Sequence, residues 1–117
     1  MSARDIRQAA LLATGKLQFR GWCKYRPENA DHKICLGEAL LTSLDDLGVI
    51  SRSRLELAWD RDPVWKKAER YISQLVAELF PGRVSRDSYP WQFNDHPDTT
   101  LEDVMLLLKH LSEIPDD

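Results

Sequence analysis

The sequence has few of the residues that mark specialised classes of protein. It contains only two cysteines, two methionines and five glycines. No stretch approaches the roughly 20 apolar residues of a membrane span, and the N-terminus lacks the apolar core of a secretory signal peptide. These scarcities exclude a disulfide-rich scaffold and a glycine-rich fibre. We therefore expect a soluble, cytoplasmic protein with reduced cysteines and no membrane association.

Neither sign of charge is in large excess. Lys and Arg number 16 against 19 Asp and Glu, which gives a formal net charge of −3. Basic residues concentrate between positions 52 and 70, but acidic residues interleave with them. Such a mixed surface offers no continuous basic stripe to a phosphate backbone, so nucleic-acid binding is not predicted.

What the sequence does contain is enough apolar material for one core. Of its 117 residues 43% are hydrophobic, which suits a single domain over residues 1–117. Apolar residues recur at helical spacing in four segments. These segments are residues 3–19, a segment between a cap at Asp31 and Gly48, a segment from Pro63 to Leu79, and a segment from a Thr99 or Thr100 cap to Leu111. The predicted fold is all-α, a compact bundle of about four main helices with apolar connecting loops.

Two shorter segments have weaker patterns. Within residues 49–60, Ser53 and Glu56 have capping-box spacing and predict a helix of about two turns. Residues 89–93 alternate aromatic side chains with polar residues or proline, which predicts one brief extended segment.

Cysteine and histidine residues suggest a metal site. Cys23, His32, Cys35 and His96 are ligand types for zinc, and His32 and Cys35 are spaced so that both could converge at a helix start. Paired Cys-x-x-Cys motifs are absent, however. We interpret Cys35 as a small core residue and His32 as solvated, and we predict no metal and no cofactor.

Cys35 is also a candidate nucleophile. It lies near the start of the second predicted helix, and Asn94, Asp95 and His96 are the residue types of a base and its orienting partner. Consecutive residues followed by Pro97 do not readily align behind one thiol. We interpret Asn94 and Asp95 as turn residues that bond local backbone amides. A thiol-dependent enzyme or metal-binding domain that uses Cys35 and His96 remains the alternative function.

Four tryptophans are many for so short a chain. Trp22 and Trp91 lie in predicted loops, and we expect them to seal the core. Trp59 and Trp65 fall beside the apolar stripe of the third long helix, and we expect them to form an exposed contact patch.

Three short motifs resemble a known family. They are Gly21-Trp22-Cys23, Cys35-Leu36-Gly37-Glu38-Ala39, and Phe93-Asn94-Asp95 before a Thr-capped helix. Their order resembles a domain of unknown function in short uncharacterised proteins of actinobacteria and their phages. Phe93 departs from the family, which more usually has Trp there, and residues 49–86 show no match. The resemblance implies a helical fold and a phage or prophage origin, and it brings no established activity.

Gly37 and the missing catalytic set lead to two hypotheses. A glycine inside a helix costs about 1 kcal/mol relative to alanine, so a neighbour should pack closely on Gly37. We expect the Asn94-Asp95 turn or the ring of Trp22 there, which would tie both apolar loops to the second helix. The leading functional prediction is a non-enzymatic interaction module that binds another protein, or a second copy of itself, through Trp59 and Trp65.

Overall fold

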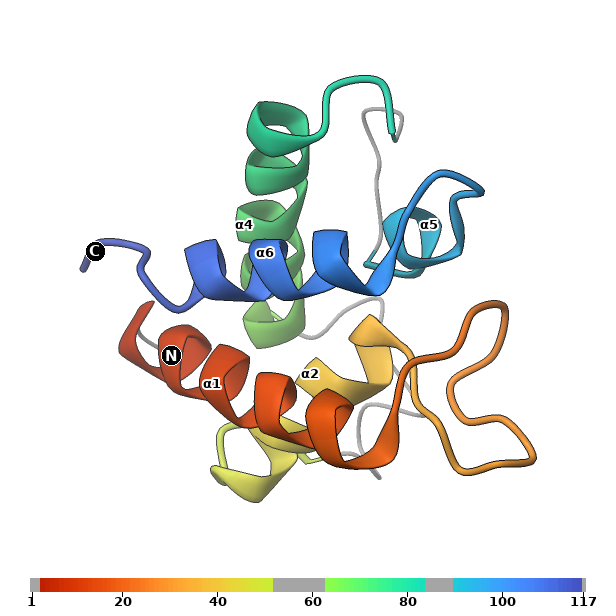
Figure 1. Cartoon of the computed structure of the whole chain (residues 1–117). Coiled ribbons are helices and arrows are strands. Elements are labelled where there is room, and N and C mark those ends of the chain that lie inside the picture. The colour runs from red at the N-terminus through yellow and green to blue at the C-terminus, as the bar shows by residue number, and fades with distance from the viewer. Residues whose placement is uncertain (1–2, 52–62, 84–89, 117) are drawn as a thin grey trace.

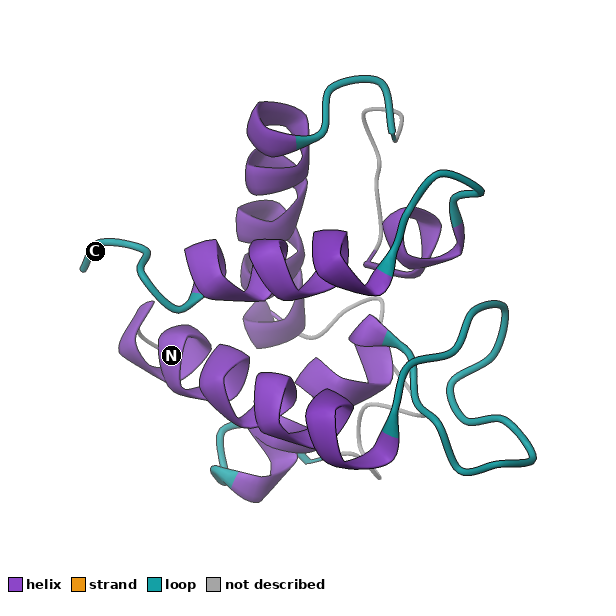
Figure 2. Cartoon of the chain, in the orientation of Figure 1, coloured by secondary structure: helices purple, strands orange, loops and turns teal. Residues whose placement is uncertain are grey.

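Apolar residues at helical spacing build the core of the described structure. The computed structural model describes residues 3–51, 63–83 and 90–116. These residues contain helices and no strand, so the predicted all-α class is confirmed (Figures 1 and 2). The helices are α1 (Ala3–Arg20), α2 (Leu36–Asp46), α4 (Pro63–Leu79), α5 (Pro90–Asp95) and α6 (Leu101–Leu111). None of them is long and apolar enough to cross a bilayer.

Helix α1 buries a narrow face of small residues. Ala9, Ala10 and Ala13 are buried between the larger Ile6 and Leu17. Because alanine has almost no side chain to keep neighbours apart, α2 and α6 can both approach α1 closely, and both pack on it. Helix α6 in turn packs on α4, so the core lies between these four helices (Figure 1).

Helix α2 begins later than the sequence predicted. Its first residue is Leu36 and its N-cap is Cys35, whereas the prediction placed a cap at Asp31. His32 has a left-handed backbone (φ 63°), and the N–H of Ile34 donates to the carbonyl of Gly21. Both features prevent a helix from starting before Cys35. At the other end Gly48 has φ 73°, which confirms the predicted positive φ after the helix.

The last two helices give one correction and one confirmation. Residues 90–95 form α5, so the predicted extended segment over 89–93 is wrong for its described part. Pro90 has the fixed φ that suits a first helical turn, and Phe93 is fully buried, with its ring centroid 5.1 Å from that of Phe80. Thr100 and Asp103 form a reciprocal capping box at the start of α6, so of the two predicted caps, Thr99 and Thr100, the helix uses Thr100. Most of the predicted short helix over 49–60 lies outside the described residues.

Candidate functional site

The segment between α1 and α2, residues 21–35, is a structured loop whose two ends pair with each other. The N–H of Cys23 donates to the carbonyl of Ile34, and the N–H of Ile34 donates to the carbonyl of Gly21, each at 3.0 Å. Tyr25 (φ 70°) and His32 (φ 63°) are left-handed, a conformation that non-glycine residues keep only when their surroundings hold it. The loop is therefore a defined surface feature.

Asn94 of α5 holds this loop to the start of α2. Its Oδ1 accepts from the indole N–H of Trp22 at 2.5 Å and from the N–H of Leu36 at 2.9 Å. Its Nδ2 donates to the Cys23 carbonyl and to Asp95 Oδ1, both at 3.0 Å. The side chain is 0% exposed, and these four bonds use its full capacity of two donors and two lone pairs.

These bonds change the interpretation of Asn94 and show how the loop is joined to α2. Asn94 does not act as a local turn residue, because three of its partners are 58 to 72 positions away in the chain. The Asn94 side chain joins the loop to the start of α2, whereas the expected close packing on Gly37 stays a prediction. Gly37 is buried next to Leu36, whose N–H is one of the bonded groups.

Asp95 and His96 also serve the loop and the turn that follows α5. Asp95 Oδ1 accepts from the N–H of Tyr25 at 2.7 Å, and the His96 carbonyl accepts from Lys24 Nζ at 2.7 Å. His96 Nδ1 accepts from the N–H of Asp98 at 3.1 Å, so this ring nitrogen is occupied. The residues suggested as a base and its partner are thus engaged in holding the backbone.

Cys35 is buried, as predicted, and it is the N-cap residue of α2. Its Sγ accepts from the N–H of Glu38 at 3.3 Å. Burial raises the pKa of its thiol to about 11, so the thiol is protonated at neutral pH. The nucleophile of thiol enzymes is the thiolate, and Cys35 does not supply one under these conditions.

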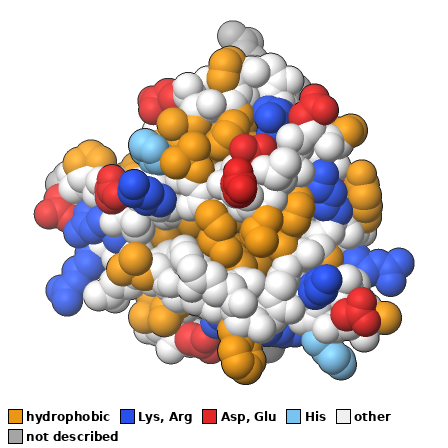
Figure 3. Space-filling model, in the orientation of Figure 1, with side chains coloured by type: hydrophobic (Ala, Val, Ile, Leu, Met, Phe, Trp, Pro, Cys, Tyr) orange, Lys and Arg blue, Asp and Glu red, His pale blue; other side chains and the backbone are white. Residues whose placement is uncertain are grey.

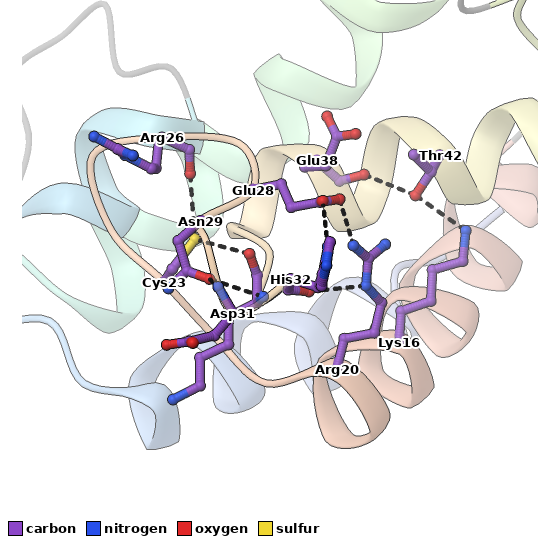
Figure 4. Close-up of polar contacts among 11 residues, drawn as sticks. Lys16, Arg20, Cys23, Arg26, Glu28, Asn29, Asp31, His32, Glu38 and Thr42 are labelled. Atoms are coloured by element: carbon purple, nitrogen blue, oxygen red, sulfur yellow. Dashed lines mark hydrogen bonds and ion pairs between the residues drawn. The ribbon is translucent and has the colours of Figure 1, made fainter.

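The other suggested metal ligands do not form a metal site with Cys35. His32 is exposed, and its Nδ1 lies 2.9 Å from Glu28 Oε2 (Figure 4). Arg20 bonds the other oxygen of Glu28, and the hydrogen bonds from His32 and from Arg20 lower the pKa of that carboxyl. Across the described ranges no group of three or more His, Cys, Asp and Glu side chains is placed to hold a metal ion.

The predicted aromatic patch is not exposed at Trp65. That side chain is only 2% exposed and shares a buried stripe of α4 with Ala68, Ile72 and Val76. The helical spacing of this stripe places position 65 at its N-terminal end. Burial of the large indole there stabilises the fold more than partial exposure at the flank of the stripe would. The prediction of an exposed Trp65 is therefore wrong. Trp59 lies outside the described residues.

Helix α1 instead carries a surface that the sequence reasoning missed. Leu11 is 63% exposed, Phe19 is 93% exposed, and Leu12 is exposed as well. A Cβ built at Gly15 would meet no atom within 4 Å. The exposed residues of α1, which we call the α1 face, are Arg4, Gln8, Leu11, Leu12, Gly15, Gln18 and Phe19. The spacing of Leu11, Gly15 and Phe19 at every fourth residue was the available signal.

Further exposed apolar side chains lie on the neighbouring helix. Leu101 and Leu106 of α6 are both exposed, and α6 packs beside α1. Figure 3 shows hydrophobic side chains gathered in the middle of one side of the molecule, where α6 and α1 meet. Apolar surface is thus not confined to a single isolated residue.

Comparison with known proteins identifies the family. The model of a family of unknown function, DUF6197, matches residues 2–113. The chain belongs to this family. The match confirms the predicted resemblance to a domain of unknown function, and it extends through residues 49–86, where the short motifs had shown none. Searches of the curated proteins and of the solved structures found no match.

Proposed function

We propose that this DUF6197 protein is a non-enzymatic interaction module and that the α1 face binds another protein. The observation that carries the proposal is the composition of this face. Three of its seven exposed residues are large and apolar, Leu11, Leu12 and Phe19, and only one, Arg4, is charged. An exposed helix face that meets only water ordinarily carries several charges.

Burial of this face would stabilise a complex. Full burial of a Leu or Phe side chain contributes about 1.5–3 kcal/mol relative to exposure. Phe19 is an anchor of the type found at the centres of interfaces, where aromatic residues contribute strongly. Gly15 has no side chain between Leu11 and Phe19, so a partner can approach the backbone of α1 there.

The rigidity of α1 favours the same reading. The helix packs on both α2 and α6, and Arg7 and Lys16 add bonds to Ile114 and Asp46. A surface that is ordered before binding loses little conformational entropy in the complex. Binding is thus better supported than chemistry, because the thiol of Cys35 is protonated at neutral pH and His96 Nδ1 is bonded to backbone. From the family resemblance alone we extend the proposal to a host or phage protein as the partner.

Site-specific photocrosslinking tests the proposal. A benzophenone amino acid is placed at Phe19 and, as a control, at Tyr25, which is exposed on loop 21–35 and does not belong to the α1 face. We expect Phe19 to give one discrete adduct with a protein of different mass, and Leu11→Glu to abolish it. Equal labelling from both positions, or no adduct from Phe19, would contradict the proposal. A covalent homodimer would show that the occupant is a second copy of the chain.

A further inference from the structure

Cys23 lies against the backbone just before Cys35, although 12 positions separate the two cysteines in the chain. Cys23 Sγ donates to the carbonyl of Lys33 at 3.2 Å, and the Cys23 N–H donates to the carbonyl of Ile34 at 3.0 Å. These carbonyls belong to the two residues just before Cys35. On the other side, the Asn94 side chain bonds both the Cys23 carbonyl and the N–H of Leu36. Cys23 is therefore bonded directly to the two residues before Cys35, and it is joined through Asn94 to the residue after Cys35.

The pairing register places the two cysteines at equivalent positions of neighbouring segments. Trp22 and Ile34 form a parallel bridge, so the next residues in register are Cys23 and Cys35. Neighbouring extended segments lie about 4.8 Å apart, and residues at equivalent positions of a parallel pair point to the same side. We expect a similar separation for Cys23 and Cys35, and it would fall within the Cα range of about 4.4–6.8 Å that a disulfide requires. Both cysteines are free and buried.

We propose that Cys23 and Cys35 form a reversible intramolecular disulfide when the protein meets a small-molecule disulfide, so that the junction of loop 21–35 with α2 is a redox switch. This inference does not depend on the α1 face. Cys23 Sγ lies 3.3 Å from the carbonyl of the exposed Arg26, so we expect the reagent to reach this thiol first.

The exchange proceeds in two balanced steps. The Cys23 thiolate attacks one sulfur of the small-molecule disulfide, forms a mixed disulfide and releases one small thiolate. The Cys35 thiolate then attacks Cys23 Sγ, forms the protein disulfide and releases the second small thiolate. The protein loses two electrons and two protons, and the small-molecule disulfide is reduced to two thiols.

The surroundings of the thiols set the rate. Burial raises the pKa of both thiols, and a charge on Cys23 further raises that of Cys35. Asp95 and Glu28 also act to raise the pKa of Cys23, Arg26 acts to lower it, and Glu38 acts to raise that of Cys35. Because the thiolate is the attacking species, the exchange is slow at neutral pH and accelerates as pH rises.

Oxidation would change the loop and the start of α2. It removes the one Sγ–H of Cys23, which lies within reach of the carbonyls of Arg26 and Lys33, and it alters the sulfur that caps α2 at Glu38. It also closes a ring over residues 23–35, which restricts the unfolded chain and raises the melting temperature. The oxidised loop is thus fixed covalently in the conformation that Tyr25 and His32 already hold.

Oxidised glutathione and mass spectrometry test the switch on the native protein. We expect the protein to lose about 2 Da without a lasting glutathione adduct, and to yield a crosslinked Cys23–Cys35 peptide after digestion. The oxidised protein should have a higher melting temperature. The oxidation rate should rise about tenfold per pH unit below the pKa of the attacking thiol. Cys35→Ser keeps an oxygen that can cap α2, and it should stop at one glutathione adduct. Cys23→Ser keeps a donor to the two carbonyls and should react far more slowly.

Three results would overturn the proposal. They are a stable glutathione adduct on the wild-type chain, a disulfide between two chains, and a reaction that occurs only at the rate of global unfolding. The last is recognised by comparing the reaction rate with the unfolding rate measured by circular dichroism under the same conditions.

Discussion

The indole N–H of Trp22 donates to Oδ1 of Asn94 at 2.5 Å, a bond between residues 72 positions apart. The same oxygen accepts from the first N–H of α2, so one carboxamide joins the loop, α2 and α5. A buried polar group with all its bonds made specifies one arrangement of its neighbours, because any other arrangement leaves a group unsatisfied.

Substitution of Asn94 should therefore be costly. In Asn94→Leu the volume is similar, but the N–H of Leu36 and the carbonyl of Cys23 lose their partner. We expect a loss of about 2–5 kcal/mol in the free energy of unfolding, measured by urea denaturation. The exposed neighbour Gln92 provides the control, since Gln92→Ala should change stability by less than about 0.5 kcal/mol. Equal effects at the two positions would show that Asn94 is not a structural hub.

Replacement of two different glycines by alanine should change the stability of the protein in opposite directions. Gly15 lies within α1 with open space around it, so Gly15→Ala should stabilise the protein by about 0.5–1 kcal/mol. Gly48 has φ 73°, where a Cβ is strained, so Gly48→Ala should destabilise it by about 1 kcal/mol. Chemical denaturation of the pair checks the sign of each change. A destabilising Gly15→Ala would mean that the space beside α1 is filled.

The α1 face should be dispensable for folding. Phe19→Glu exchanges an exposed aromatic ring for a charge, and we expect stability to stay within about 0.5 kcal/mol of the wild type. Leu17→Ala, two positions away on the buried side, should cost about 2–5 kcal/mol. Thermal melting of the two variants measures the contrast. If Phe19→Glu unfolds the protein, the ring belongs to the core and not to a binding surface.

Acid should weaken the start of α6 through Asp103. Partial burial acts to raise the pKa of this carboxyl, but hydrogen bonds from Arg83 and from the N–H of Thr100 outweigh it, and the pKa is lowered. A carboxyl with a lowered folded-state pKa contributes stability above its unfolded pKa and loses that contribution as pH falls. We therefore expect the wild type to lose stability below about pH 4 more steeply than Asp103→Asn. Urea denaturation at several pH values measures this, and Glu102→Gln, at an exposed neighbouring position, should keep the wild-type slope.

The main helices could be predicted because their signals are local. The start of α4 at Pro63 and the capping box of Thr100 and Asp103 depend on residues within one turn of each other. The start of α2 could not be predicted, because Ile34 is held by Gly21, which precedes it by 13 positions. The five-residue alternation at 89–93 is too short to distinguish a strand from one helical turn.

The candidate site likewise contains some features that could be predicted from the sequence and some that could not. The exposed Leu11 and Phe19 share a face at helical spacing, and this pattern was readable from the sequence. The role of Asn94 was not, because nothing near position 94 indicates that its partners are Trp22 and Leu36. Trp65 was misassigned although positions 65, 68, 72 and 76 recur at helical spacing, so its place in the buried stripe was also readable from the sequence.

Helix α5 has only six residues, and a helix of that length is not stable by itself in water. Its described attachments are the burial of Phe93 and the bonds of Asn94, Asp95 and His96 to the loop. Loop 21–35 and α5 should consequently open as one cooperative unit, although 54 residues separate them in the chain (residues 36–89). The amide protons of Cys23, Ile34 and Leu36 would then exchange with solvent deuterium at one shared opening free energy, lower than that of the α1 amides.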